Sequence, residues 1–246
     1  NRKIKFFYSS SSHIFNNQFR YPQKESTKAK FNSFYGLAKF LGKEICEFYR
    51  NEKRIFCSVG IMYTNVSINI GKNFLIKTII SQLKSKKKFV KLNNPNAKID
   101  IISTKDAVKA MYKIMQLEKS NTFIISRSKF ISIKQIYNQI SKKMGINKKI
   151  IINSKKNKNK NNYLIGDNKK IQKMTKWKPE DNLNDIVDLF CYNSATWVNE
   201  FYFSEYAEMC WEEEIPTIQF NIQSEFGYAG HNLYSLEQFT RRAKIF

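Results

Sequence analysis

The chain has 246 residues, with 43 lysines and arginines against 20 aspartates and glutamates, and its formal net charge is +23 at pH 7. Hydrophobic residues make up 42% and aromatic residues 15% of the sequence, which supports a buried core in one domain plus an extension. No segment approaches the roughly 20 apolar residues of a membrane-spanning helix. The four cysteines have spacings that exclude the usual zinc motifs and disulfide frameworks, so we expect reduced thiols, mostly buried.

The first predicted elements are a strand and a helix. Residues 3–8 indicate a short strand, which runs into four consecutive serines and then His13. Further on, apolar residues recur at three- and four-residue steps from Phe34 to Phe48 and predict an amphipathic helix.

Two residues at the start of this helix are candidates for acid–base chemistry. Tyr35 and Lys39 are four residues apart and therefore share one face of the helix. A lysine ammonium beside a tyrosine favours the phenolate, lowers the pKa of the phenol and lets it exchange protons nearer neutral pH. The alternative is an exposed pair on the surface of an amphipathic helix.

The elements that follow alternate between strands and helices, and this alternation predicts a parallel sheet with helices on both faces. The strand at 54–63 is apolar throughout, as expected for a strand buried on both sides. Ser132 can cap a helix that ends at Gly145. Strands are expected at 54–63, 89–92, 122–126 and 150–152, and helices at 73–83, 105–117 and 132–144.

The order of motifs resembles the extended short-chain dehydrogenase/reductases, most closely the GDP-mannose 4,6-dehydratases, over about 190 residues. In that family a strand ends in a Ser-Thr-Ser-Glu loop, and Tyr-Gly-x-Ala-Lys opens the next helix. The resemblance implies a Rossmann-like α/β fold, with Ser11 as the catalytic serine or threonine, Tyr35 as the acid–base residue and Lys39 as its partner. The other matching segments are Tyr21-Pro22-Gln23-Lys24-Glu25-Ser26, Gly71-Lys72-Asn73-Phe74, Ala97-Lys98-Ile99-Asp100, Lys105-Asp106-Ala107-Val108, Leu164-Ile165-Gly166-Asp167 and Lys176-Trp177-Lys178-Pro179.

Several departures from the family pattern concern catalysis and phosphate binding. The family holds NADP on a Gly-x-x-Gly-x-x-Gly turn, and none of the eight glycines here forms that pattern. The match starts at what corresponds to the fourth or fifth strand, so we expect the N-terminal cofactor half to be missing or on a separate chain. His13 stands where the family has its catalytic glutamate. Ile99 and the segment 65–71 replace arginines suited to a diphosphate.

Two lysine-rich segments are candidate contacts for an RNA backbone. A run of lysines also has a simpler interpretation as a solvated loop, and neither segment has the interleaved aromatic residues of a base-stacking surface. Any contact with RNA would therefore be to phosphates, without sequence readout. The candidates are Lys84, Lys86, Lys87 and Lys88, and Lys155, Lys156, Lys158 and Lys160.

Composition changes after residue 190, so we divide the chain into a degenerate dehydratase-like domain at 1–190 and an extension at 191–246. The extension carries eight acidic and only three basic residues and is rich in aromatic side chains. It can dock on a partner or pack on its own domain, and the sequence favours neither. The acidic run at 212–214 has no histidine at ligand spacing, so we expect a solvated turn and no metal site.

These departures predict a pseudoenzyme without a cofactor. The leading hypothesis is a structural subunit of a large mitochondrial assembly, above all the mitochondrial ribosome, with other subunits and the rRNA backbone as partners. A second hypothesis is an accessory subunit of respiratory complex I. A third hypothesis is a split NADP-dependent nucleotide-sugar 4,6-dehydratase acting on GDP-mannose. It is supported by Ser11, Tyr35 and Lys39.

Overall fold

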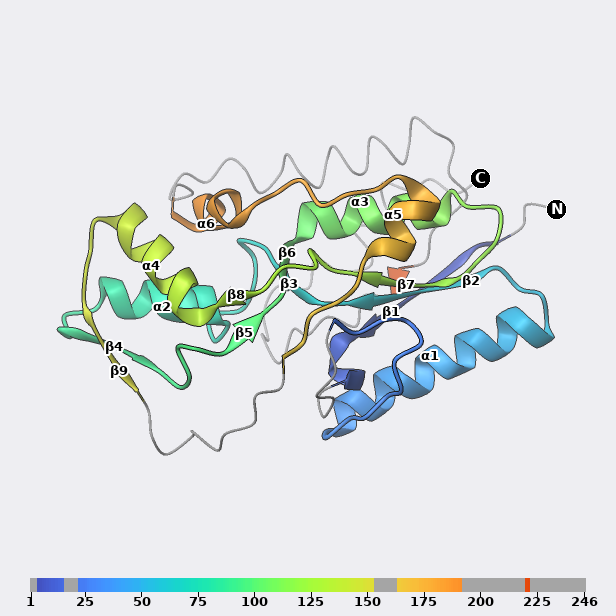
Figure 1. The fold of residues 1–246 in the computed structure, drawn as a ribbon, viewed down its shortest axis with the longest axis horizontal. Coiled ribbons are helices and arrows are strands. Elements are labelled where there is room, and N and C mark those ends of the chain that lie inside the picture. Colours follow the sequence, from blue (N-terminus) through green and yellow to red (C-terminus); the bar gives the residue numbers. More distant parts are fainter. Residues whose placement is uncertain (1–3, 16–21, 153–162, 192–219, 222–246) are drawn as a thin grey trace, which may run out of the picture.

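The computed structural model describes residues 4–15, 22–152, 163–191 and 220–221, and its centre is a parallel sheet (Figure 1). The order of strands across the sheet is β10-β1-β2-β7. Neighbouring strands all run in parallel, with Ser11 opposite Met62 and Met62 opposite Ile125. The strands are β1 (Phe6–Ser11), β2 (Cys57–Met62), β7 (Thr122–Ile125) and β10 (Phe220–Asn221). The prediction of a Rossmann-like parallel sheet is confirmed.

Helices cover both faces of this sheet (Figure 1). Successive side chains of a strand point to opposite faces, and in β2 this alternation sends Val59 towards α1 (Phe34–Glu52) and Met62 towards α3 (Thr104–Met115). The short helix α5 (Lys169–Thr175) shares the apolar cluster of α3. All six residues of β2 are buried, as the sequence predicted.

A second apolar core lies away from the central sheet. It joins three helices to the parallel pair β4–β9, and Ile79, Ile136 and Ile186 are fully buried in it. The short pairs β3–β6 and β5–β8 are parallel and antiparallel, respectively. The elements are the 3-10 turn η1 (Ser12–Phe15), α2 (Leu75–Lys84), α4 (Ile133–Met144), α6 (Leu183–Cys191), β3 (Thr64–Val66), β4 (Phe89–Leu92), β5 (Lys98–Ile99), β6 (Ile101–Ser103), β8 (Ile131–Ser132) and β9 (Lys149–Ile152).

Local sequence signals set the ends of α4. The Ser132 hydroxyl accepts the N–H of Gln135, and the Gln135 side chain accepts the N–H of Ser132, which satisfies two donors at the helix start. Gly145 ends the helix in the left-handed conformation, with φ of 65°. Both ends agree with the sequence-based prediction.

Three expectations need correction or lie outside the described residues. The first strand is β1, which begins at Phe6 and extends through the serines to Ser11, because each of these residues pairs with β2. The apolar residues of α1 face outward: Phe34, Leu41, Ile45 and Phe48 are all at least half exposed. Of the extension 191–246, the structure describes Cys191 and the two residues of β10, so the acidic run at 212–214 is outside the described part. None of the described helices is long and apolar enough to cross a membrane.

Candidate functional site

The sheet brings Ser11, Tyr35 and Lys39 to one place. Ser11 is the last residue of β1, and its hydroxyl accepts the backbone N–H of His13 at 3.3 Å. Tyr35 and Lys39 lie in the first turns of α1, which packs directly against β1 and η1. The carboxyl ends of parallel strands are where α/β folds bind ligands. The three predicted residues therefore gather where a catalytic site would be expected.

Lys39 is buried, which contradicts the simple interpretation of an exposed surface pair. Its side chain is 6% exposed, and its ammonium donates to the carbonyl of Ser9 at 3.0 Å. The ammonium lies 5.7 Å from the ring centre of Tyr35 and 5.5 Å from that of Tyr8. A cation next to two aromatic rings in a largely dry position interacts more strongly with them than it would in water.

A close approach of two backbones places Tyr35 against His13. A Cβ on Gly36 would lie 2.8 Å from the carbonyl oxygen of His13, so only glycine lets α1 come this near to η1. Ser33 caps the helix by accepting the N–H of Gly36 at 3.1 Å. The rings of His13 and Tyr35 then meet edge to face, 5.4 Å between centres. An imidazole therefore touches the phenol that the sequence singled out.

The described residues do not fit a complete NADP site. The residues that would face the reactive end of such a coenzyme are present: they are Ser11, Tyr35 and Lys39. The described glycines, however, are scattered over helices, strands and loops, and none forms a turn that could hold a pyrophosphate at a helix N-terminus. The pyrophosphate would have to be held by residues other than the described ones.

A buried carboxylate organises the chain next to this site. Asp100 is 1% exposed and accepts three backbone N–H groups, from Arg127 at 2.9 Å, Ser128 at 3.0 Å and Gly166 at 3.3 Å. Burial raises the pKa of Asp100 to about 7, although the three donors and the Arg127 guanidinium oppose this rise. Asp100 and Gly166 come from separate motifs of the resemblance, which assigned them no role. In the sequence, the signal for this buried polar group was that Asp100 stands between apolar residues.

Gln23 joins another pair of distant motifs. It is fully buried, its side-chain oxygen accepts from Tyr63 at 2.9 Å and from the N–H of Ile165 at 2.8 Å, and its amide donates to the carbonyl of Tyr163. Nearby, the Glu25 carboxylate accepts the N–H of Ile124 in β7. The segments around 23 and 165 therefore hold each other in place beside the carboxyl ends of the strands.

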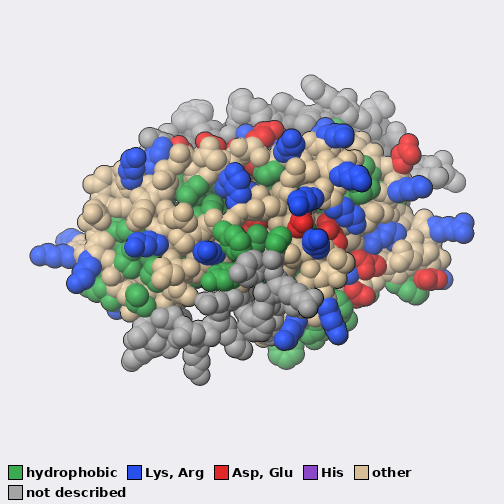
Figure 2. Space-filling model, in the orientation of Figure 1, with side chains coloured by type: hydrophobic (Ala, Val, Ile, Leu, Met, Phe, Trp, Pro, Cys, Tyr) green, Lys and Arg blue, Asp and Glu red, His purple; other side chains and the backbone are tan. Residues whose placement is uncertain are grey.

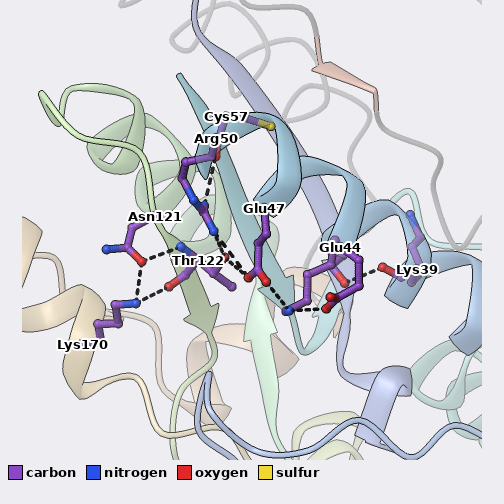
Figure 3. A network of polar contacts seen from close by, with 10 residues as sticks. Lys39, Glu44, Glu47, Arg50, Cys57, Asn121, Thr122 and Lys170 are labelled. Atoms are coloured by element: carbon purple, nitrogen blue, oxygen red, sulfur yellow. Dashed lines mark hydrogen bonds and ion pairs between the residues drawn. The ribbon is translucent and has the colours of Figure 1, made fainter. Parts of the chain in front are cut away.

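The far end of α1 is fixed by a network of polar contacts (Figure 3). Arg50 donates to the carbonyl of Cys57 at 3.1 Å and to the hydroxyl of Thr122 at 3.0 Å, so one guanidinium connects α1 with β2 and β7. Thr122 donates in turn to Glu47, which also accepts from Lys43 at 2.8 Å. Burial acts to raise the pKa of Glu47, but the hydrogen bonds from Lys43 and Thr122 outweigh it and lower that pKa. The sequence analysis missed this network.

Replacing Arg50 by methionine should lower the free energy of unfolding by about 2–3 kcal/mol, because two hydrogen bonds from a charged donor are lost in a partly buried place. Chemical denaturation of the variant measures this loss. Arg54→Met is the matched control, since Arg54 is exposed and the substitution is the same. Equal destabilisation by both variants would contradict the role given to the network.

The predicted phosphate contacts are divided between described and undescribed residues. Lys84 is the last residue of α2, the lysines at 86–88 lie between α2 and β4, and all four are exposed. Lys155, Lys156, Lys158 and Lys160 are outside the described residues. Figure 2 shows basic side chains spread over the whole visible face, without one dense patch. Ile99 lies in β5 and packs against the second apolar core, so it offers no charge to a diphosphate.

Within the described ranges, no group of three histidine, cysteine, aspartate or glutamate side chains is placed to hold a metal ion. Cys46 and Cys57 are free thiols buried in one apolar cluster, while Cys191 is half-buried.

Comparison with known proteins connects this site with nucleotide-sugar enzymes. Residues 1–190 match the family described as GDP-mannose 4,6 dehydratase. The chain is 26% identical over 147 residues to GDP-mannose 4,6 dehydratase 2 of Caenorhabditis elegans, with 58% of this chain and 38% of that protein covered. It is 25% identical over 215 residues to human GDP-mannose 4,6 dehydratase, with 75% and 56% covered. The chain thus spans about half the length of the curated relatives it matches.

Two solved structures share the fold at low sequence identity. The structure of RMD from Pseudomonas aeruginosa complexed with NADPH has a TM-score of 0.71 at 12% identity, covering 77% of this chain and 66% of that one. A UDP-galactose 4-epimerase has a TM-score of 0.64 at 16% identity, covering 77% and 63%.

Proposed function

The chain belongs to the GDP-mannose 4,6 dehydratase family, and from this premise we propose that it provides the acid–base part of a nucleotide-sugar 4,6-dehydratase. The observation that supports this proposal most is the buried Lys39 ammonium beside Tyr35, at the end of the strand that carries Ser11. This third hypothesis from the sequence agrees better with the family than a ribosomal role does.

The residues present can perform the proton transfers that such a reaction needs. The Lys39 ammonium favours the phenolate of Tyr35, so this side chain can take a proton from a sugar hydroxyl and return it. The Ser11 hydroxyl can hydrogen-bond to the same oxygen of the sugar. His13 lies against the Tyr35 ring, where its imidazole can act as a second base.

NADP, when bound, would supply hydride transfer to and from the sugar. Because the described residues lack a pyrophosphate cradle, that part of the site would come from residues other than the described ones, and in an enzyme split between two chains the second chain would provide it.

The test is to incubate the protein, together with any chain that co-purifies with it, with GDP-mannose and NADP and to follow loss of water from the sugar by mass spectrometry. The same mixture without added NADP is the control. Binding of GDP-mannose by the protein alone, measured by calorimetry, separates a failure to bind the sugar from a failure to hold the coenzyme. The proposal would be refuted if the protein did not bind GDP-mannose and no water were lost from the sugar.

A second proposal is that the chain is a non-catalytic subunit of a mitochondrial RNA-containing assembly such as the ribosome. It is supported by His13 in place of the family's glutamate, by uncharged Ile99 in place of an arginine, and by the net charge of +23. Lysines on an RNA surface displace counterions, so co-sedimentation with ribosomal RNA should weaken steeply as salt is raised. Co-purification with a protein-only respiratory complex would favour the complex I alternative.

A further inference from the structure

Two cysteines from different elements face each other between α1 and the central sheet. Cys46 lies seven residues after Lys39 and four before Arg50, so these three side chains share one face of α1. Lys39 and Arg50 donate to carbonyls of β1 and β2, so this face of the helix lies against the sheet. Cys57 begins β2, and its side chain points to the same side as Val59, towards α1. The two thiols therefore meet in the layer between the helix and the sheet.

The surroundings of the two thiols are apolar and closed to solvent. Cys46 is 5% and Cys57 is 4% exposed, and both belong to one apolar cluster with Val59. In Figure 3, Cys57 lies beside the turn of α1 that carries Arg50. The Cys46 thiol donates a hydrogen bond to the sulfur of Cys57. This contact places the two sulfur atoms next to each other, which a disulfide requires.

The two thiols differ in reactivity. The hydrogen bond from Cys46 lowers the pKa of Cys57; burial acts against this effect, and the positive charge of Arg50 adds to it. The same hydrogen bond raises the pKa of Cys46, because Cys46 supplies the shared proton, and burial raises that pKa further. The thiolate is the nucleophilic form of cysteine. Cys57 is therefore the sulfur that reacts first with an oxidant, and Cys46 is the neighbour that can complete a disulfide.

We propose that Cys46 and Cys57 form a reversible oxidation site for hydrogen peroxide, an oxidant small enough to reach buried sulfur. The Cys57 thiolate attacks one peroxide oxygen, the O–O bond breaks, and a sulfenic acid and hydroxide form. The hydroxide takes up the proton that Cys57 had released. The Cys46 thiol then loses its proton while its sulfur displaces the sulfenic oxygen, which leaves as water. Two thiols are thus oxidised to one disulfide, and the peroxide is reduced to two waters.

The disulfide would join α1 to β2 and close a short loop of the chain between them. Such a crosslink restricts the unfolded chain, so the oxidised protein should unfold at a temperature about 5–10 °C higher than the reduced protein. Because α1 also carries Tyr35 and Lys39, oxidation would fasten the helix that holds the candidate acid–base pair. Cys46 is eleven residues after Tyr35, about 16 Å along the helix, so this inference does not depend on the proposed enzymatic function.

The experiment treats the reduced, natively folded full chain with hydrogen peroxide, blocks the remaining thiols with iodoacetamide and digests the product with trypsin. Trypsin cuts after Arg50 and after Arg54, so the two cysteines lie on the separate peptides 44–50 and 55–72. We expect mass spectrometry to find these two peptides joined, and dithiothreitol to separate them again by thiol–disulfide exchange. Calorimetry of the undigested protein measures the expected rise in unfolding temperature.

Single variants test the role of each sulfur. In Cys46→Ala, the Cys57 sulfenic acid has no thiol beside it and should be captured by dimedone. In Cys57→Ala, oxidation of Cys46 should be at least about 10-fold slower than oxidation of Cys57 in the first variant, because little thiolate is present. Neither variant should show the rise in unfolding temperature. Cys191→Ala is the matched control, since Cys191 is a free cysteine on α6, and it should behave like the unmodified chain.

Three outcomes would overturn the proposal. The first is that the joined peptides are absent from the oxidised native chain, and the second is that they appear only when urea is present. The third is that disulfides to Cys191 or Cys210 form equally well, because pairing would then not depend on the contact between α1 and β2. The unmodified chain gives these results by itself, so they stand even if a variant fails to fold, which circular dichroism would show.

Discussion

Tyr35→Phe should lower the turnover of GDP-mannose by about 100- to 10,000-fold, the usual contribution of a positioned acid–base group. The variant keeps the ring that meets His13 and loses only the hydroxyl. The affinity for the nucleotide sugar should therefore change little, and the loss should appear in kcat. Steady-state kinetics with the complete, coenzyme-loaded enzyme separates the two quantities.

Tyr49→Phe removes the same hydroxyl from the opposite end of the same helix, where the side chain is 46% exposed, and should leave kcat unchanged. Lys39→Met gives an independent check. Without its ammonium the phenolate is less favoured, so the pH at which turnover is fastest should move upward. An unaltered pH profile together with full activity of Tyr35→Phe would show that the two residues have a structural role only.

Asp100→Ala should lower the free energy of unfolding by about 4 kcal/mol, because three buried N–H groups lose their common acceptor and a cavity remains. Urea denaturation measures this change. Glu180→Ala is the control: Glu180 is an exposed carboxylate paired with Lys109, and such surface pairs contribute little. A small effect of Asp100→Ala would mean that water can replace the carboxylate.

The same carboxyl group makes stability depend on pH. The folded-state pKa of Asp100, about 7, is above its ordinary value of 3.8. Between these values the folded protein holds a proton that the unfolded chain releases, so this group's contribution to stability falls as pH rises from about 4 to about 7. Asp100→Asn has no such proton and should lose this slope. Denaturation curves of both proteins at about pH 5 and about pH 8 compare the slopes.

The helix that carries the candidate site illustrates the limits of sequence patterns. Its position and its Tyr35–Lys39 pair could be predicted, since they depend on intervals along one helix. The face of the helix that is buried against the sheet could not be predicted. Periodicity assigns the apolar residues to one face, but the Thr122 hydroxyl and the carbonyls of Ser9 and Cys57 accept from basic side chains and attract the polar face instead.

Motif order likewise predicted that distant segments belong to one family, but it gave no roles for Gln23, Asp100 and Gly166. Their hydrogen bonds join residues between 27 and 142 positions apart in the chain. Such partners depend on how strands and loops meet at the edge of the sheet, and no local pattern contains that information.

By itself, the sequence determined the alternation of strands and helices, the buried strand β2, the capped ends of α4 and the position of the Tyr35–Lys39 pair on one helix, because each depends on intervals between neighbouring residues. Only the tertiary structure decided that Lys39 is buried, that His13 meets Tyr35, that one carboxylate accepts N–H groups from two distant segments and that the apolar residues of α1 face outward. These features arise from contacts between elements far apart in the chain, where burial and hydrogen bonding select one packing among several that the same pattern permits.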